Sequence, residues 1–229
     1  MKYSCVIPIY NEETRIADVL THVSQITEIS EIICVDDGST DNSTKVVRKN
    51  FPHVTLIRHK RNLGKTAAVI TGVNIAGGNN LVLLDSDLKG LKSEEIDHAI
   101  TAFEQNELDC LLLNTAAMNK LDQILRRIFR CLLLAAGNRI IRKPCLEKAL
   151  ASASFESYHL EIAQNKYLMD HNKKAAYYDI SAVDVSKISK EGYVKGAIGE
   201  IQMWSQIITY AGLLFFLKQT LFFARNKVG

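Results

Sequence analysis

The feature that most constrains the fold is a regular alternation of short apolar runs with stretches of helical periodicity in the first half of the chain. Apolar runs of strand length occupy residues 3–10, 31–39, 54–59, 80–85 and 108–114, and again 175–185. Apolar residues recur at helical spacing in 16–26, 66–76 and 96–103. This alternation predicts an α/β fold with a mostly parallel, doubly wound sheet that is covered on both faces. In such a sheet the ligand crevice lies at the carboxyl ends of the strands.

The first predicted strand ends in the motif PIYNEE. Pro8 terminates the apolar run, and Tyr10, Asn11 and Glu12 are expected to face the crevice. The alternative is a plain turn before a helix, because Asn is a favourable N-cap residue and acids suit a first helical turn.

The second predicted strand ends in VDDGSTDNS. Asp36 and Asp37 at a buried strand end need partners. They are suited to hydrogen-bond a ribose or a base edge, and Gly38 would let a ligand approach closely. The alternative is a turn of the Asx type before a helix that Asp41 or Asn42 caps.

The fourth predicted strand ends in LVLLDSDL. Asp85 and Asp87, separated by Ser86, can hold one hard divalent cation through oxygen ligands. A bound Mg²⁺ or Mn²⁺ would in turn hold a diphosphate. The two acids could instead cap the next helix, but Ser93 is a better cap residue for it. A phosphatase with an aspartyl nucleophile also carries such a pair, although on its first strand.

The stretch RNLGKTAAV contains Gly-Lys-Thr, which mimics the end of a phosphate-binding Walker A loop. The full pattern needs a glycine where His59 stands, so the chain has no such loop. Lys65 at a helix N-terminus is nevertheless well placed to meet a phosphate. The alternative is a solvated lysine.

The second half of the chain contains two amphipathic or apolar segments. Residues 119–143 place Leu and Ile on one helical face and Arg126, Arg127 and Arg130 on the other. This basic face is either solvated or turned towards anionic lipid. Residues 201–217 are uncharged but shorter than the ~20 residues of a membrane span. We expect this helix at a membrane interface; packing on the domain or in a homo-oligomer is the alternative.

The net charge, the cysteines and the first residues bear on the partners and the location of the protein. The formal net charge of +3 does not indicate a nucleic-acid partner. The five cysteines are irregularly spaced and two of them, Cys5 and Cys34, lie in apolar runs, which is typical of buried thiols in a reducing compartment. The first residues read as a strand and not as a signal peptide. We therefore expect a cytoplasmic protein, peripheral on the cytoplasmic face of a membrane if the apolar helix lies there.

Taken together, CVIPIYNEE, EIICVDDGSTDNS, NLGKTAAVITGVNIAGG and LVLLDSDL resemble, in order and spacing, the donor-binding half of family 2 glycosyltransferases with the GT-A fold. The resemblance is to the non-processive bacterial members. It implies a donor-binding half at 1–114, an acceptor-side half of the same domain at 115–199, and a hydrophobic C-terminal helical extension at 200–229. It also implies transfer of a sugar, with inversion and a divalent metal, from a nucleoside-diphosphate sugar, with a UDP-sugar favoured.

The resemblance assigns roles to individual residues. The donor site would comprise Pro8, Tyr10, Glu12, Asp36, Asp37, Lys65, Asp85 and Ser86. The metal would be held by Asp85, Asp87 and Asp184. Relatives often carry a histidine where VDVSKISKEG places Asp184, so this residue is either an acidic third ligand or a solvent-facing acid.

The catalytic residues implied are Asp87 and Glu161. Glu161 in YHLEIAQ matches the acid that often faces the acceptor, and it would be the general base for a hydroxyl acceptor. With a phosphate acceptor it would only orient the substrate, and a salt-bridged helix glutamate is the alternative. The QxxRW pattern of processive synthases and the SGF stretch of polyprenyl-phosphate transferases are both absent. The acceptor (lipid, glycan or small molecule) is thus left open, and a non-catalytic nucleotide-sugar binding protein is the alternative function.

Overall fold

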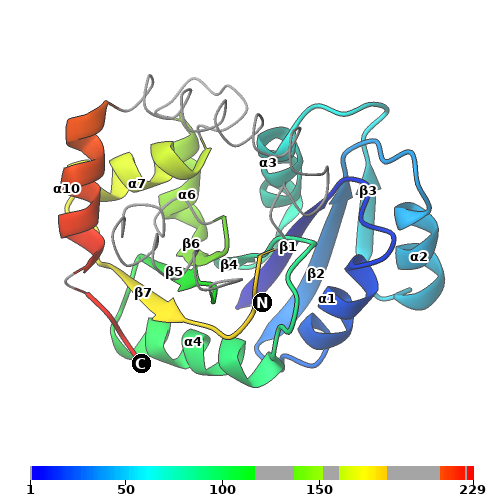
Figure 1. Cartoon of the computed structure of the whole chain (residues 1–229), viewed down its shortest axis with the longest axis horizontal. Coiled ribbons are helices and arrows are strands. Elements are labelled where there is room, and N and C mark those ends of the chain that lie inside the picture. Colours follow the sequence, from blue (N-terminus) through cyan, green and yellow to red (C-terminus); the bar gives the residue numbers. More distant parts are fainter. Residues whose placement is uncertain (1, 117–136, 152–159, 185–211, 225) are drawn as a thin grey trace.

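A seven-stranded sheet forms the centre of the protein (Figure 1). The computed structural model describes residues 2–116, 137–151, 160–184, 212–224 and 226–229. The strand order is β3-β2-β1-β4-β6-β5-β7. The strands are β1 (Tyr3–Ile9), β2 (Ile29–Asp36), β3 (Thr55–Arg58), β4 (Asn80–Leu83), β5 (Cys110–Asn114), β6 (Arg139–Arg142) and β7 (Ala175–Asp179). The mostly parallel α/β sheet predicted from the sequence is confirmed.

Strand β6 is the exception to the parallel arrangement. It lies between β4 and β5 and runs antiparallel to both, with Arg139 opposite Leu83 on one side and Leu112 on the other. The sequence prediction was wrong here, because these residues were assigned to the end of an amphipathic helix over 119–143. The rest of that predicted helix, 119–136, lies outside the described residues.

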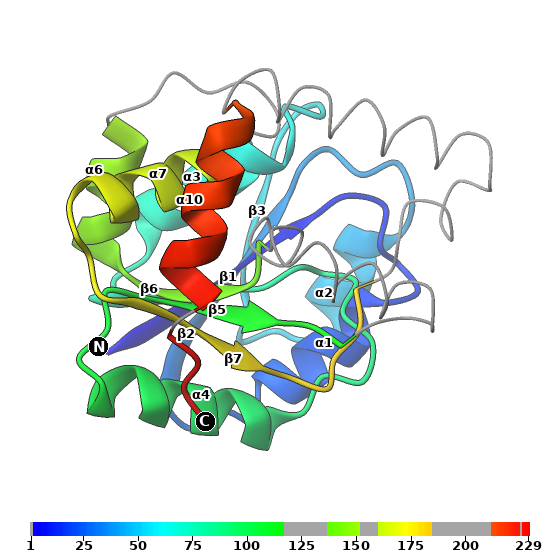
Figure 2. The same ribbon diagram turned by 60° about the vertical axis from the view of Figure 1, so that its left-hand side comes forward.

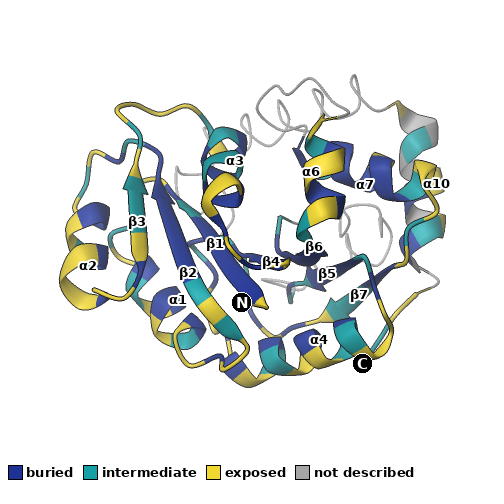
Figure 3. Cartoon of the chain, turned by 180° about the vertical axis from the view of Figure 1, so that it is seen from behind, coloured by how far each residue is buried: buried dark blue, intermediate teal, exposed yellow. Residues whose placement is uncertain are grey.

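Helices cover both faces of the sheet. Successive strand residues point to opposite sides, so the apolar strands contribute to a separate core on each face. Val6 packs into one core and its neighbour Ile7 into the other. The core that contains Ile7 is closed by α1 (Ile16–Val23), α2 (Ser43–Asn50) and α4 (Ser93–Gln105). The core that contains Val6 is closed by α3 (Lys65–Ile75), α6 (Lys143–Ala151), α7 (Leu160–Asp170) and α10 (Leu213–Ala224). Figure 3 shows the central strands as the most buried part of the molecule.

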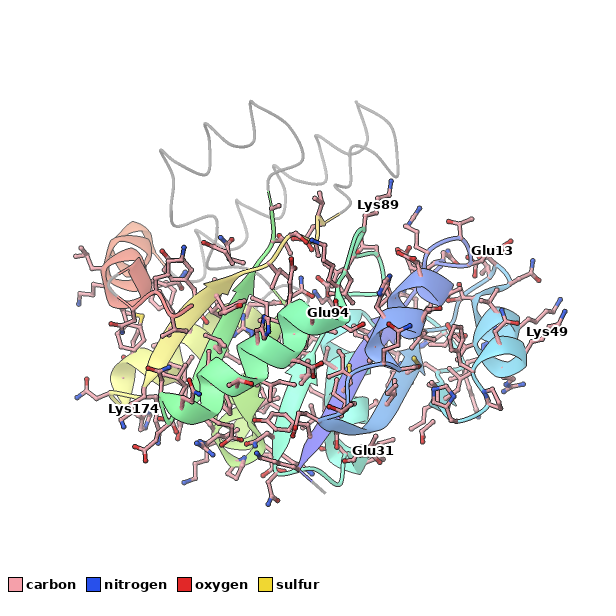
Figure 4. All side chains as sticks on the ribbon, turned by 90° about the horizontal axis from the view of Figure 1, so that it is seen from below. Glu13, Glu31, Lys49, Lys89, Glu94 and Lys174 are labelled. Atoms are coloured by element: carbon pink, nitrogen blue, oxygen red, sulfur yellow. The ribbon has the colours of Figure 1, made fainter. Side chains whose placement is uncertain are left out.

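Many charged side chains lie at the periphery of these layers, although a few, such as Arg139, are fully buried. Figure 4, seen from the side that α4 covers, shows Glu13, Lys49 and Lys174 at the outer rim. Ser93 begins α4 but does not cap it, contrary to the sequence prediction. Its hydroxyl donates to the carbonyl of His22 at 3.0 Å, so it ties α4 to α1.

The C-terminal helix α10 packs on the domain, beside α7 and β7 (Figure 2). Phe223 is fully buried in the core that contains Val6. The chain beyond α10 then pairs with β7, since Tyr177 N donates to Asn226 O at 3.0 Å and Val228 N to Tyr177 O at 3.1 Å. This agrees with the packed alternative for the described part of the segment, and residues 201–211 lie outside the described residues. None of the helices described here is both long enough and apolar enough to cross a bilayer.

Candidate active site

Four segments meet at one edge of the sheet. Asp85 follows β4, Thr115 follows β5, and Asp184 lies beyond β7. Asn138 precedes β6, and because β6 is antiparallel to its neighbours its amino end lies at their carboxyl ends. The edge at which a parallel sheet normally binds its ligand therefore collects side chains from both halves of the chain.

Backbone hydrogen bonds bring the late segment onto the acidic loop after β4. Lys89 and Val183 donate to each other's carbonyl at 3.0 and 2.9 Å, and Ala116 N donates to Ala182 O at 2.8 Å. Lys89 is labelled at this end of the molecule in Figure 4. This pairing is what places Asp184 beside Asp85 and Asp87.

Asp184 is held by two side chains. Its Oδ2 accepts a hydrogen bond from Thr115 Oγ1, and its Oδ1 accepts one from Asn138 Nδ2 at 3.2 Å. Burial raises the pKa of Asp184 to about 6, and the negative charges of Asp85 and Asp87 contribute to the rise. The three carboxylates therefore lie close enough to repel one another.

Lys65, the first residue of α3, partly neutralises this group. Its Nζ lies 2.6 Å from Asp85 Oδ1 and 3.5 Å from Glu161 Oε1, at the start of α7. Burial of the ammonium lowers the pKa of Lys65, but Asp85 and Glu161 outweigh it and hold the pKa above its usual value. A Cβ on Gly137 would lie 2.5 Å from this Nζ, so the glycine leaves room for the ammonium.

A small pocket adjoins this ion pair. Besides Lys65, Asp85, Gly137 and Glu161, it is lined by Pro8, Val69, Leu83, Leu84, Leu160 and Gln164. Gln164 is buried, and its Oε1 has no hydrogen-bond partner among the described residues. The pocket thus joins the end of β1 to residues of α3 and α7, and both polar and aliphatic side chains line it.

Asp36 and Asp37 are both buried and both engaged within the protein. Asp36 accepts hydrogen bonds from Ser39 N at 2.8 Å and from the Thr44 hydroxyl. Asp37 accepts from Leu63 N and Gly64 N, at 2.9 and 2.7 Å, and so shapes the loop before α3. In this structure both acids organise the loops around the crevice.

Gly38 serves the same loop. Its φ is +76°, and a Cβ there would lie 2.6 Å from the backbone carbon of Arg61. The space that a side chain at this position would occupy is filled by the chain's own backbone, and the approach of a ligand to Gly38 stays a prediction.

The remaining predicted donor residues differ in exposure. Tyr10 is 45% exposed, whereas Glu12 and Ser86 are buried. Glu12 Oε2 accepts a hydrogen bond from Arg15 Nε at 2.7 Å. Tyr10 is the member of this group most accessible to a base, and the donor-binding roles of all these residues stay predictions.

Comparison with known proteins identifies the family of this chain. Residues 4–157 match the family model described as glycosyl transferase family 2. The chain belongs to this family. Mixed α/β architecture and the neighbours described next identify its fold as GT-A.

Curated relatives match about half of this family 2 chain. An undecaprenyl-phosphate 4-deoxy-4-formamido-L-arabinose transferase of Yersinia pestis (strain Pestoides F) is 34% identical over 134 residues, which are 55% of this chain and 40% of that protein. The protein of the same name from Proteus mirabilis is 37% identical over 112 residues, 45% of this chain and 34% of that protein. The aligned region thus spans about two fifths or less of these relatives.

Solved structures share the fold at low sequence identity. Glucosyl-3-phosphoglycerate synthase from Mycobacterium tuberculosis, in complex with Mn²⁺, UDP and glucosyl-3-phosphoglycerate, has a TM-score of 0.70 and 19% identity and covers 91% of this chain and 79% of its own. S. aureus TarS 1–349 has a TM-score of 0.63 and 20% identity and covers 83% of this chain and 62% of its own.

The chemistry of the carboxylates at this edge fits a divalent cation, although their arrangement in the structure does not yet form a metal site. Within the described ranges, no three acidic, histidine or cysteine side chains are arranged so that they could hold a metal ion as they stand. Asp85, Asp87 and Asp184 nevertheless interact electrostatically, and carboxylate oxygens are the ligands that Mg²⁺ prefers. The Lys65 ammonium already lies against one of these carboxylates, which shows that the position attracts positive charge.

Sequence reasoning missed three residues of this site: Thr115, Gly137 and Asn138. Thr115 and Asn138 are small polar residues at the end of LLLNT and the start of NRII, where an apolar strand meets the crevice edge. The signal for Asn138 was hidden because β6 was not predicted, so no strand end was expected there.

Proposed function

We propose that this family 2 chain transfers a sugar from a nucleoside-diphosphate sugar, with inversion, to an oxygen of an acceptor. The observation that carries the proposal is the cluster of Asp85, Asp87 and Asp184 with Lys65 at the carboxyl edge of the sheet. Structural neighbours that contain UDP and Mn²⁺ or Mg²⁺ support a similar donor and metal for this chain.

Asp85, Asp87 and Asp184 would hold the Mg²⁺ or Mn²⁺ ion. When bound, such an ion offsets the negative charge that grows on the leaving diphosphate. Lys65 adds a second positive charge beside Asp85, at the N-terminus of α3, where phosphate oxygens are favoured. Together these groups stabilise the transition state electrostatically.

In the reaction, an acceptor oxygen forms a bond to the anomeric carbon while the bond from that carbon to the diphosphate oxygen breaks. The nucleoside diphosphate leaves from the face opposite to the attack, so the configuration inverts. Glu161 lies beside Lys65 and lines the pocket with Gln164. With a hydroxyl acceptor, Glu161 would be the base that accepts the proton.

We further propose a lipid phosphate as the acceptor, because the curated relatives are named undecaprenyl-phosphate transferases. A phosphate oxygen is ionised at neutral pH and needs no general base. In that case Glu161 keeps Lys65 in position by their 3.5 Å ion pair and removes no proton. The two acceptor classes therefore predict different effects of Glu161→Gln: a large loss of turnover for a hydroxyl and a small one for a phosphate.

A panel of UDP- and GDP-sugars, scored by the nucleoside diphosphate released with Mn²⁺ and an undecaprenyl-phosphate or hydroxyl acceptor, tests the proposal. We expect release with one donor, and its loss in Asp87→Asn. Asp170→Asn, which changes an exposed acid at the end of α7, is the matched control and should keep activity. Binding of a sugar nucleotide without release, for every donor and acceptor, would instead support the non-catalytic binding protein.

A further inference from the structure

Asn138 lies where three strand ends meet, and it is 1% exposed. It directly precedes β6, and its carbonyl accepts a hydrogen bond from Leu113 N of β5 at 3.0 Å. Its side-chain Oδ1 accepts from the backbone N–H of Asp85 at 2.8 Å, and its Nδ2 donates to Asp184 Oδ1 at 3.2 Å. One buried amide therefore contacts the acidic loop after β4 and the late acid together.

The chemistry of its partners fixes the orientation of this amide. A backbone N–H can only donate, so the Asn138 oxygen must face Asp85. A carboxylate that is ionised can only accept, so the Asn138 nitrogen must face Asp184. A neutral amide offers an acceptor on one side and a donor on the other, which matches these two partners.

We propose that Asn138 is a positioning residue that couples Asp85 to Asp184 and so sets the spacing of the carboxylates that bind the metal. The proposal rests on the proposed function, since it assumes that these acids hold the ion of the donor complex. In this role Asn138 acts through Asp85 and Asp184, and we assign it no contact of its own with the ion or the sugar.

Thr115 completes the arrangement from the other side. Its hydroxyl donates to Asp184 Oδ2 while Asn138 donates to Oδ1, so both oxygens of this carboxylate are oriented by neutral donors. Each oxygen keeps a further lone pair for a cation. Partners that orient metal ligands in this way typically contribute about 10- to 100-fold to metal affinity.

The expected effects of two substitutions explain why asparagine suits this position. Alanine removes both hydrogen bonds and lets the Asp184 carboxylate turn away from Asp85. Aspartate keeps the acceptor for Asp85 N–H but cannot donate to Asp184 when ionised, and it adds a like charge beside a carboxylate that Asp85 and Asp87 already repel.

A double-mutant cycle tests the proposal. The affinity for UDP is measured by calorimetry with Mn²⁺ and with EDTA in the wild type, Asn138→Ala, Asp184→Ala and the double variant. We expect Asn138→Ala to weaken Mn²⁺-dependent UDP binding by about tenfold, with UDP binding in EDTA unchanged. In the Asp184→Ala background, the further loss caused by Asn138→Ala should be clearly smaller than in the wild type, because the carboxylate that it positions is gone and only its hydrogen bond from Asp85 N–H is left to lose.

Asn114→Ala is the matched control. Asn114 also donates its amide to an aspartate, Asp179, at 2.6 Å, but on the exposed part of the neighbouring strands. It should leave UDP binding unchanged. Melting temperatures are recorded for all variants, and if Asn138→Ala does not fold, Thr115→Val is tested in the same cycle, with the same expected loss and the same dependence on Asp184.

Two results would overturn the inference and leave the proposed function standing. One is Mn²⁺-dependent UDP binding that Asp184→Ala weakens but Asn138→Ala does not. The other is a double variant in which the two losses multiply. If the wild type binds UDP equally well in EDTA and in Mn²⁺, the metal part of the proposed function fails, and the inference fails with it.

Discussion

Asp184 is destabilising at neutral pH in the folded chain. Burial, together with Asp85 and Asp87, raises its pKa from 3.8 to about 6. Between these values the folded chain binds more protons at this group than the unfolded chain does, so the free energy of unfolding falls as pH rises. Above about pH 6 the carboxylate is charged in both states, and the full loss is present. A buried acid kept under repulsion is typical of a functional site.

This gives a prediction about pH. Asp184→Asn removes the charge, so its free energy of unfolding relative to the wild type should increase as pH rises from below 3.8 to above 6. Urea unfolding of both proteins across this range measures the difference. A difference that does not change with pH would show that neither burial nor the neighbouring acids raise the pKa of Asp184 in the folded chain.

Gly38 supports a second prediction at the residue scale. Gly38→Ala must adopt a φ of +76° and place its Cβ 2.6 Å from the backbone of Arg61, which cannot move without the loop before α3. Gly90 has a similar φ of +68° but open space around it, so Gly90→Ala is the control for backbone strain alone. We expect the control to lose about 1–2 kcal/mol in urea unfolding, and Gly38→Ala clearly more. Equal losses would contradict the packing of this loop on Gly38.

The site was only partly predictable from residues. The acids at strand ends could be recognised as candidate site residues, because charges after a buried apolar run need a partner. Asp36 and Asp37 gave the same signal as Asp85, yet their carboxylates bind the protein's own backbone, the Thr44 hydroxyl and the side chains of Arg58 and His59. Nothing in the sequence distinguishes a carboxylate that orders a loop from one that faces a ligand.

At the scale of elements, the parallel strands could be predicted and β6 could not. Each parallel strand is an apolar run bounded by polar residues. In contrast, β6 has only four residues, and the first and last of them, Arg139 and Arg142, are arginines. Its Ile-Ile pair also fits the helical pattern that precedes it, and its position depends on partners far away in the sequence. For α6, Pro144 in the first turn was an available signal, since proline is tolerated there and not further inside.

Helix α10 provides the prediction for this scale. Phe223 is fully buried against the core, whereas Leu221 on the same helix is 59% exposed. Phe223→Ala should lower the free energy of unfolding by about 3–5 kcal/mol, because it removes a large side chain and leaves a cavity. Leu221→Ala, the matched control, should change it by no more than about 0.5 kcal/mol. If Phe223→Ala lowers the free energy of unfolding no more than this control does, the packing of Phe223 does not stabilise the domain.

At the scale of the whole molecule, four motifs in fixed order identified the GT-A fold, although each of them alone had another explanation. All four motifs lead to the same edge of the sheet. Only the folded sheet brings them together there. The second half was less predictable, because its contribution to the site comes through Asn138 and Asp184, on segments that the sheet brings beside β4. The acceptor-side half at residues 115–199 stays a prediction. Membrane contact by the C-terminal helix also stays a prediction.

The packing of α10 also changes how membrane contact should be tested. Deletion of residues 207–229 would remove Phe223 from the core as well as any membrane-binding surface, so loss of binding to vesicles would be ambiguous. Leu221→Glu changes an exposed position and leaves the core intact. If α10 touches lipid, this variant should bind anionic vesicles more weakly than the wild type in a sedimentation assay; equal binding would exclude this face of the helix.

The central claim is that Asp85, Asp87 and Asp184 hold a divalent ion for a nucleoside diphosphate. Calorimetry of UDP binding to the wild type and to Asp87→Asn, each with Mn²⁺ and with EDTA, tests it most directly. We predict that Mn²⁺ strengthens UDP binding to the wild type by about tenfold or more, and that Asp87→Asn loses most of this gain. UDP binding of equal affinity in Mn²⁺ and EDTA, unchanged in Asp87→Asn, would contradict the account.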